Sequence, residues 1–451
     1  MRKSLLICLS FMMFWAVPAT AASRPVVSIQ SAYVVLKMDV ARRQFLGASR
    51  LSIRNESGRT LTRLPVTLNS GLHIGKALDG NKQQLTVSEQ LTKLQGAPEV
   101  QVNQATVTLA TPLAPGDSMD LNLYYRGSFS PQYAGGIYGV GTPGPQFSLI
   151  QFWNFAYPAP AAANVDALTA LYAASHYKAD MQLEIPADLK VASALQVVGE
   201  KEAGGRKTVR LHGTRDLPPP MVAVGPYENA HFPGVDAFYM DGNGELAESL
   251  GVKLAETSKL LSTWLGAAPA GATTTVIDLP AGDGHATAPG FLALPLAYTP
   301  TADELTDLRQ DMVIQWMPDA PTGDQGSWRA GLMSLAMDLA NGMDMKAIKE
   351  AAFSAAKADS SGKSFSPATA KLMFCLIDDL AGEGGFRQMV GALRQTFTGI
   401  STKNSELAPY LVAHAPNKAV KKLVEHWMQD GKAQKTLQRA ADYHSLLKKV
   451  D

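Results

Sequence analysis

Apolar and polar residues alternate along several segments in the first half of the chain. A period of two places every second side chain on one face of a β-strand. We therefore predict strands over residues 31–40, 48–54, 100–109, 120–125, 177–186 and 207–212. Turn-forming residues lie between some of these segments, at 55–58 (NESG) and 114–117 (APGD). The first half of the chain thus reads as a β domain.

The apolar positions take up helical spacing in the second half. Leu246, Leu250, Leu254, Leu261 and Leu265 fall on one face of a helix, because they recur at multiples of about 3.6 residues. The same spacing predicts helices over residues 245–265, 331–339, 368–381, 385–397, 419–428 and 433–447, with a short strand over 275–279. The change of period near residue 230 predicts an α+β multidomain protein.

One further helix begins with a recognisable N-terminal signal. Thr301 and Glu304 have the spacing of a capping box, in which each side chain accepts a hydrogen bond from the backbone of the other residue. The helix that they open carries apolar residues at 305, 308, 312 and 316 on one face. We expect this face to be buried.

The first residues are typical of a secretory signal peptide. Arg2 and Lys3 precede an apolar run, which ends at the small-residue site Ala19-Thr20-Ala21. We therefore predict a signal peptide over residues 1–21 and a secreted or periplasmic mature protein. The apolar run is short for a membrane-spanning helix, which needs about 20 residues. An uncleaved N-terminal anchor is the alternative interpretation of this segment. We expect no transmembrane helix in the mature chain.

Composition narrows the class of protein. The 451 residues include 46% hydrophobic and 18% charged residues, with a net charge of +1, which indicates a folded protein without the basic excess of a nucleic-acid binder. Of the two cysteines, Cys8 lies in the predicted signal peptide, so the mature chain has no intramolecular disulfide. Cys375 lies in an apolar helical segment, and we predict a buried, inert thiol rather than a nucleophile.

Several phrases along the mature chain resemble the peptidase M1 family, the gluzincin aminopeptidases that include alanyl aminopeptidase and leukotriene hydrolase. They occur in the family's order at residues 44–55 (QFLGASRLSIRN), 152–158 (FWNFAYP), 179–228, 276–280 (VIDLP), 290–294 (GFLAL), 382–386 (GEGGF) and 425–428 (EHWM). The resemblance implies a β saddle or sandwich domain over residues 22–230, followed by a mostly helical thermolysin-like (zincin-like) domain over 231–451. It also implies that the C-terminal helical repeat domain of many members is absent.

The family's zinc motif is altered in this sequence. The resemblance implies an H-E-x-x-H motif followed by Gln-Trp, in which the two histidines bind zinc and the Glu is the general base. Gln315 and Trp316 match the end of that phrase. Counting back from them, Gln310 replaces the first histidine, Asp311 the general base and Ile314 the second histidine. An amide is a poor zinc ligand, and an alkyl side chain is none.

Other parts of the family's machinery are also missing. Ala330 stands where the third zinc ligand, a Glu, is expected from the phrase 328–331 (WRAG). The loop that holds the substrate amine with a Glu corresponds to residues 284–290 (GHATAPG), which offer His285 but no carboxylate. Phe365 or Ser366 stands at the place of the tyrosine that stabilises the tetrahedral intermediate. We therefore predict no metal and no cofactor.

These observations favour a catalytically inactive pseudopeptidase, which binds a peptide, a protein or a small ligand in or near the former substrate cleft. His285, Gln310, Asp311, Gln315 and Trp316 are the candidate binding residues. An active aminopeptidase-like metallohydrolase with a non-standard zinc site is the alternative, and a structural subunit whose cleft is filled by side chains such as Ile314 is a third hypothesis. No nucleic-acid partner is expected.

Overall fold

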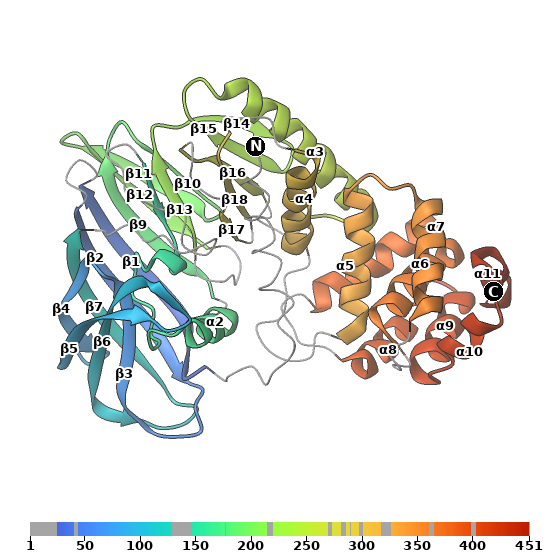
Figure 1. Cartoon of the computed structure of the whole chain (residues 1–451), viewed down its shortest axis with the longest axis horizontal. Coiled ribbons are helices and arrows are strands. Elements are labelled where there is room, and N and C mark those ends of the chain that lie inside the picture. The colour runs from blue at the N-terminus through green and yellow to red at the C-terminus, as the bar shows by residue number, and fades with distance from the viewer. Residues whose placement is uncertain are drawn as a thin grey trace. The chain divides into compact units, whose positions relative to one another are not determined.

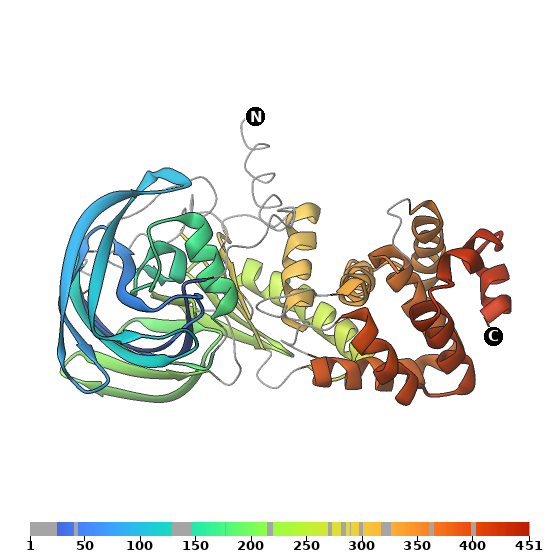
Figure 2. The ribbon, with the colours of Figure 1, turned by 90° about the horizontal axis from the view of Figure 1, so that it is seen from below.

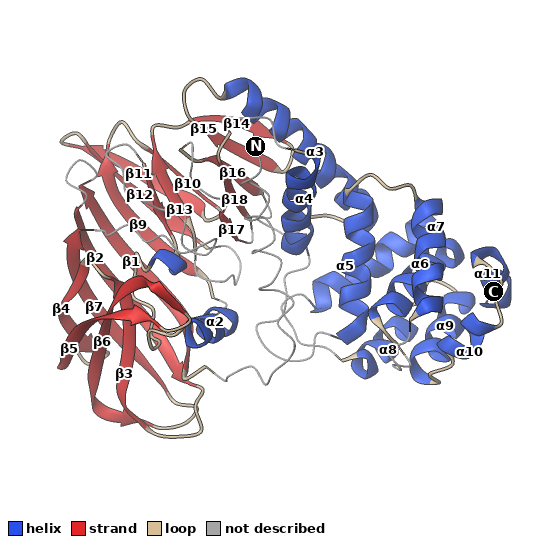
Figure 3. Ribbon diagram, in the orientation of Figure 1, coloured by secondary structure: helices blue, strands red, loops and turns tan. Residues whose placement is uncertain are grey.

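The computed structural model describes residues 25–39, 44–128, 147–175, 177–213, 220–268, 273–280, 286–288, 290–296, 301–316, 326–359, 365–397 and 403–450. These residues form two compact units. One contains residues up to 231 together with 236–251 and 273–299, and the other contains 232–235, 252–272 and 300–451. Figure 3 shows that strands dominate the first unit and helices the second. Strands early in the chain and helices late in it confirm the predicted α+β class.

The first unit is built on a large sheet of ten strands (Figure 1). Its order is β11-β12-β9-β1-β2-β7-β4-β5-β6-β3, in which β1 and β9 are parallel. The strands are β1 (Val27–Asp39), β2 (Gln44–Asn55), β3 (Leu61–Asn69), β4 (Leu72–Asp79), β5 (Gln84–Leu94), β6 (Ala97–Leu113), β7 (Ser118–Ser128), β9 (Ala179–Pro186), β11 (Gln196–Ala203) and β12 (Arg206–His212). Figure 2 shows that this sheet curves around helix α2 (Val165–Ala174).

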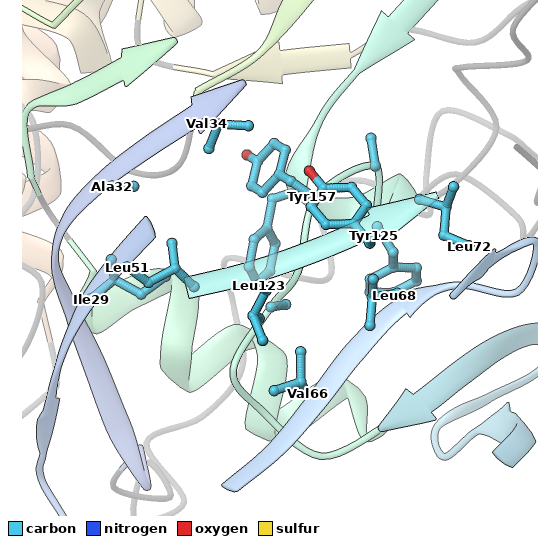
Figure 4. Packing of buried hydrophobic residues seen from close by; sticks show 14 of the residues in the cluster. Ile29, Ala32, Val34, Leu51, Val66, Leu68, Leu72, Leu123, Tyr125 and Tyr157 are labelled. Atoms are coloured by element: carbon cyan, nitrogen blue, oxygen red, sulfur yellow. The ribbon is translucent and has the colours of Figure 1, made fainter. Parts of the chain in front are cut away.

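The inner face of the curved sheet forms the main hydrophobic core of this unit. Leucine, isoleucine and valine side chains from β1, β2, β3 and β7 meet around Tyr125 and Tyr157 (Figure 4). A glycine makes room for the first of these rings, because a Cβ on Gly47 would lie 2.2 Å from the ring of Tyr125. Each fully buried aliphatic side chain contributes about 1.5–3 kcal/mol. The apolar positions of the alternating pattern are therefore the ones that face this core, and the polar positions face solvent.

Two smaller sheets complete the strand content. One has the order β10-β13-β8 and the other β14-β15-β16-β18-β17. Their strands are β8 (Ser148–Ile150), β10 (Lys190–Ser193), β13 (Val222–Gly225), β14 (Glu228–Phe232), β15 (Val235–Tyr239), β16 (Thr274–Asp278), β17 (Ala286–Ala288) and β18 (Phe291–Leu294). β16 and β18 are parallel, and β17 runs antiparallel to β18 at the end of the five-stranded sheet.

The helices lie mainly in the second half of the chain. They are α3 (Gly244–Leu265), α4 (Ala302–Trp316), α5 (Gly326–Ala340), α6 (Met345–Ala358), α7 (Pro367–Phe397), α8 (Asn404–Ala413), α9 (Lys418–Val424), α10 (Ala433–Gln438) and α11 (Tyr443–Val450). A π-helical turn over Glu425–Gln429 follows α9. No helix among the described residues is long and apolar enough to cross a membrane.

The predicted elements match the observed ones unevenly. The strands predicted from alternation and the helix over 245–265 correspond to observed elements with shifted ends. The single helix predicted over 433–447 is wrong, because α10 ends at Gln438 and α11 begins at Tyr443. The two helices predicted around residue 383 form one run, α7, with a break at Gly382, whose φ of 69° is left-handed. Helices α2, α6 and α8 were not predicted.

Candidate functional site

Helix α4 carries the residues at which the sequence placed the altered zinc motif. Leu308, Met312 and Trp316 are buried, as their spacing predicts, and Val313 is buried with them, whereas Leu305 is only half-buried. The side of the helix away from this apolar face carries the motif positions. Residue 310 is exposed, and residues 311 and 314 are half-buried. A helix with a buried apolar stripe thus leaves Gln310, Asp311 and Ile314 as its more accessible face.

Two candidate residues are only partly covered by the structure. His285 lies outside the described residues, and so does the side chain of Gln315, although Gln315 belongs to α4. The ring of Trp316 is 2% exposed, and the guanidinium carbon of Arg394 lies 4.9 Å from its centroid. Trp316 is therefore buried within the helical unit, where Arg394 makes a cation–π contact with its ring.

Arg394 on α7 fixes the ends of two helices. Its Nε donates a hydrogen bond to the carbonyl of Trp316, the last residue of α4, at 3.2 Å. Its terminal nitrogens donate to the carbonyls of Leu265, the last residue of α3, at 2.5 Å and of Ala267 at 3.3 Å. A cation placed here also suits the negative ends of both helix dipoles. Burial lowers the pKa of Arg394 to about 10.

Helix α5 carries Ala330, the residue that the resemblance predicts in place of the third zinc ligand. Ala330 is exposed, whereas its neighbours Trp328 and Arg329 are buried. The next residue, Gly331, faces α7 at close range, because a Cβ there would lie 2.5 Å from the backbone nitrogen of Lys371 and 2.6 Å from the Cβ of Ala370. The absence of a side chain at Gly331 therefore allows α5 and α7 to approach closely.

The donor atoms at these positions do not fit a zinc ion. Structural and catalytic zinc sites use three or four Cys, His, Asp or Glu ligands. Gln310, Ile314 and Ala330 supply an amide, an alkyl group and a methyl group, and Asp311 supplies the one carboxylate. Across the residues that the structure describes, no group of three or more His, Cys, Asp or Glu side chains could hold a metal ion.

Several histidines on the strands pair with a single carboxylate instead. His212 Nδ1 lies 2.6 Å from Asp180 Oδ1, and His231 Nδ1 lies 2.7 Å from Asp236 Oδ1. Both pairs are open to solvent. Such exposed pairs contribute about 1 kcal/mol or less to stability, and each provides too few ligands for a metal site.

A buried carboxylate organises the sheet that ends in β17. Asp278, the last residue of β16, is fully buried. Its Oδ2 accepts hydrogen bonds from the Met240 backbone N–H at 3.0 Å and from the Asn243 amide at 2.7 Å, and its Oδ1 accepts one from the Leu296 N–H at 2.9 Å. One side chain thus joins three segments, including the one that follows β18.

Asp278 and Arg394 were not singled out from the sequence. Asp278 lies within the phrase at 276–280, but only the folded chain brings its three donors together. The acceptors of Arg394 are more than 75 residues away in the sequence. A charged residue inside an apolar segment was the available signal, because such a charge is buried only when it is paired or hydrogen-bonded.

Cys375 agrees with its prediction. Its thiol is fully buried on α7. Burial raises the pKa of the thiol from 9.0 to about 12, although Lys349 and Lys371 oppose the shift. The thiol therefore remains protonated at neutral pH and is a poor nucleophile.

Comparisons with known proteins address the fold. A mutant of the M1 zinc metallopeptidase of Deinococcus radiodurans matches with a TM-score of 0.55 and 16% identity, covering 89% of this chain and 94% of that one. This fold is shared with the M1 zinc metallopeptidases. The unmutated enzyme from that organism matches with a TM-score of 0.53, 16% identity and the same coverage.

Two ligand complexes of such proteins are similar as well. A two-domain M1 zinc metallopeptidase mutant bound to L-tryptophan matches with a TM-score of 0.53 and 17% identity. A mutant from Deinococcus radiodurans bound to the substrate Tyr-Ser-Ala matches with 0.52 and 17%, and both matches cover 89% of this chain and 94% of the other. No family model matches the sequence, and no curated protein does. The similarity thus establishes the two-domain M1 fold, including the predicted β domain followed by a helical region.

Proposed function

We propose that this chain is a secreted or periplasmic, catalytically inactive pseudopeptidase that binds a peptide. The observation that carries the proposal is the side-chain set at residues 310, 311, 314 and 330. On the fold of a zinc peptidase, these positions of α4 and α5 offer one carboxylate, at Asp311, and no histidine. A single carboxylate without a metal to lower the pKa of water supplies too little for peptide hydrolysis.

The five-stranded sheet supports a peptide as the ligand. β17 forms the end of this sheet, so its outer edge pairs with no other strand of the described residues. An extended peptide can add to such an edge through main-chain hydrogen bonds, with alternate side chains giving specificity. Asp278 fixes the neighbouring strands through its three hydrogen bonds. The strands next to β17 are therefore tied together by hydrogen bonds to a buried carboxylate.

The tripeptide Tyr-Ser-Ala is a suitable probe, because it is the ligand in one of the similar structures. Binding is measured by calorimetry, and hydrolysis by chromatography of the same mixture after prolonged incubation. The proposal expects saturable binding with no cleavage, whether zinc or a chelator is added.

Cleavage that a chelator abolishes would contradict the proposal and favour the alternative, a metallohydrolase with a non-standard zinc site. If the protein binds neither Tyr-Ser-Ala nor longer peptides, the result would contradict peptide recognition and favour the hypothesis that the protein is a structural subunit. The secretion part has its own test, which is the intact mass of the protein exported by its host. We expect a mature chain beginning near residue 22, and retention of residues 1–21 would contradict cleavage.

A further inference from the structure

The outer face of the large sheet carries an unusual apolar patch. Tyr33 on β1 is 44% exposed, Leu46 on β2 is 53% exposed and Tyr124 on β7 is 45% exposed. These are three of the eight large hydrophobic residues that are exposed in the described part of the chain. Scattered exposed apolar residues need no explanation, but a group on three adjacent strands does.

The strand register shows that these residues are neighbours. Tyr124 lies opposite Ala48 of β2, and Ala48 lies opposite Val35 of β1. On β2, Leu46 is two residues from Ala48, and on β1, Tyr33 is two residues from Val35. Because residues two apart on a strand point to the same side of the sheet, all five residues share the outer face. We call these five residues the outer-face patch. Ala48, between the larger side chains, contributes only a methyl group.

The side chains that flank the outer-face patch are mainly basic. Lys76 lies opposite Tyr124, with its Nζ 6.0 Å from the ring centroid. Arg126 lies opposite Leu46, and Arg210 lies opposite Gln182, the next residue of the row beyond Val35.

Several other charged side chains next to the patch are paired with each other. Lys37 binds Glu184 at 2.7 Å, and Arg50 binds Asp120 at 2.6 Å. Asp180 at the border of the patch is hydrogen-bonded to His212 Nδ1 and adds one negative charge to that border. None of the ion pairs within the described residues includes Lys76, Arg126 or Arg210. The patch is therefore apolar at its centre, and its border has a net positive charge from Lys76, Arg126 and Arg210.

The size of the patch argues against a protein partner. A half-exposed tyrosine contributes roughly 100 Å², since a whole aromatic side chain presents about 150–250 Å². The five residues together offer roughly 300 Å², whereas a standard protein interface buries about 800 Å² on each partner. A chain of sugar rings needs less area, because the C–H face of one pyranose covers one aromatic ring. Carboxylates on the sugars would match the three cations.

We propose that the outer-face patch binds an anionic polysaccharide. Sugar faces stack on Tyr33 and Tyr124, and sugar carboxylates pair with Lys76, Arg126 and Arg210. Tyr33 already donates a hydrogen bond to Gln182 at 3.4 Å, so its ring leans toward β9 and lies along the face. The patch shares no residue with β17 or α4 and does not depend on the proposed function.

The test is affinity electrophoresis of the full chain in gels that contain polygalacturonate, with dextran as the neutral comparison. We expect retardation by polygalacturonate but not by dextran. Tyr33→Ala and Tyr124→Ala should each weaken binding by roughly tenfold, the change that corresponds to about 1.4 kcal/mol. Arg126→Gln should weaken it as well. Leu91→Ala is the matched control, because Leu91 is 55% exposed on β5 and lies outside the patch.

Three results would overturn the proposal. One is no retardation by polygalacturonate, alginate or hyaluronate. A second is retardation that the Tyr33→Ala/Tyr124→Ala double variant leaves unchanged, which would indicate attraction by charge alone. The third is a dimer in sedimentation equilibrium that Tyr124→Ala dissociates, which would make a second copy the occupant. Both tyrosines are exposed, so circular dichroism should show that the variants keep the fold.

Discussion

Asp278 provides the sharpest test of how the five-stranded sheet is held. In Asp278→Ala, the N–H groups of Met240 and Leu296 and the amide of Asn243 lose their acceptor. An unpaired buried donor costs about 1–3 kcal/mol. The bond from Leu296 is buried and the other two are part-buried, so water can replace some of the loss. We expect a destabilisation of roughly 3–5 kcal/mol for the alanine variant.

Asp278→Asn separates hydrogen bonding from packing, because the side chain keeps its size. One orientation of the amide loses only the bond from Leu296, since its NH₂ group then faces that donor. We therefore expect a smaller loss, about 1–3 kcal/mol. Asp344 is the matched control. It accepts hydrogen bonds from Lys346 and Ala347 at the start of α6, where asparagine caps as well as aspartate, so Asp344→Asn should change stability by less than about 0.5 kcal/mol.

Native-state hydrogen exchange is the suitable assay, because a chain with two compact units need not unfold in one step. The amides of Met240 and Leu296 report the loss directly. Each should exchange roughly tenfold faster for every 1.4 kcal/mol lost locally. The reasoning is refuted if both amides keep their wild-type protection in Asp278→Ala, or if Asp344→Asn has an equal effect on them.

Three further predictions concern the helical unit and alkaline pH. Gly331→Ala should destabilise the protein by about 1–3 kcal/mol, because the new Cβ overlaps α7. Gly391→Ala is the control and should stabilise the protein by about 0.5–1 kcal/mol, because the space around Gly391 is open. Equal effects of the two substitutions in thermal unfolding would contradict the close approach of α5 and α7. Arg394→Met should cost about 3–5 kcal/mol, since three carbonyls lose a charged donor, and urea unfolding with wild-type stability would show that these bonds are unimportant. Burial raises the pKa of Cys375 from 9.0 to about 12 and the pKa of Tyr125 above its usual value of 10.0. The unfolded chain therefore loses these protons at lower pH than the folded chain, and the free energy of unfolding should fall as the pH rises from about 9 to 12. If a Cys375→Ser variant keeps the same slope of stability against alkaline pH, the thiol does not contribute.

Sequence patterns predicted the parts of the fold in which one residue face is buried. The alternation in β1 and β7 and the leucine spacing in α3 reflect such faces. β5 and β11 were missed because most of their residues are exposed, so they carry no alternating pattern. α6 was missed because two of its four buried residues are alanines, Ala352 and Ala356, which weakens the periodic signal.

The candidate site shows a similar division. The sequence could predict that Gln310, Asp311, Ile314, Gln315 and Trp316 lie on one helix, because a helical pattern keeps its spacing in sequence. The hydrogen bonds of Asp278 and Arg394 could not be predicted, since they join segments that only folding brings together. The same holds for the outer-face patch, which depends on the register of three strands. The sequence could show each tyrosine in an alternating segment but not that the two share a surface.

The proposed lack of catalytic activity can be tested by introducing the zinc-binding residues of the family motif. The variant Gln310→His/Asp311→Glu/Ile314→His/Ala330→Glu places the family's donor set on α4 and α5. If the two helices have retained the geometry of the fold, this variant should hold close to one zinc per chain, whereas single substitutions should not. A quadruple variant that folds but binds no zinc would contradict the assignment of these positions.

Zinc content of the purified, untagged wild-type protein tests the central claim most directly. The protein is incubated with zinc and desalted, and the bound metal is counted by mass spectrometry. We predict less than about a tenth of a zinc ion per chain, because Gln310, Ile314 and Ala330 offer no adequate ligand. About one tightly held zinc ion per chain would contradict the account and would identify the protein as a metal-binding member of its fold, with ligands drawn from elsewhere in the chain.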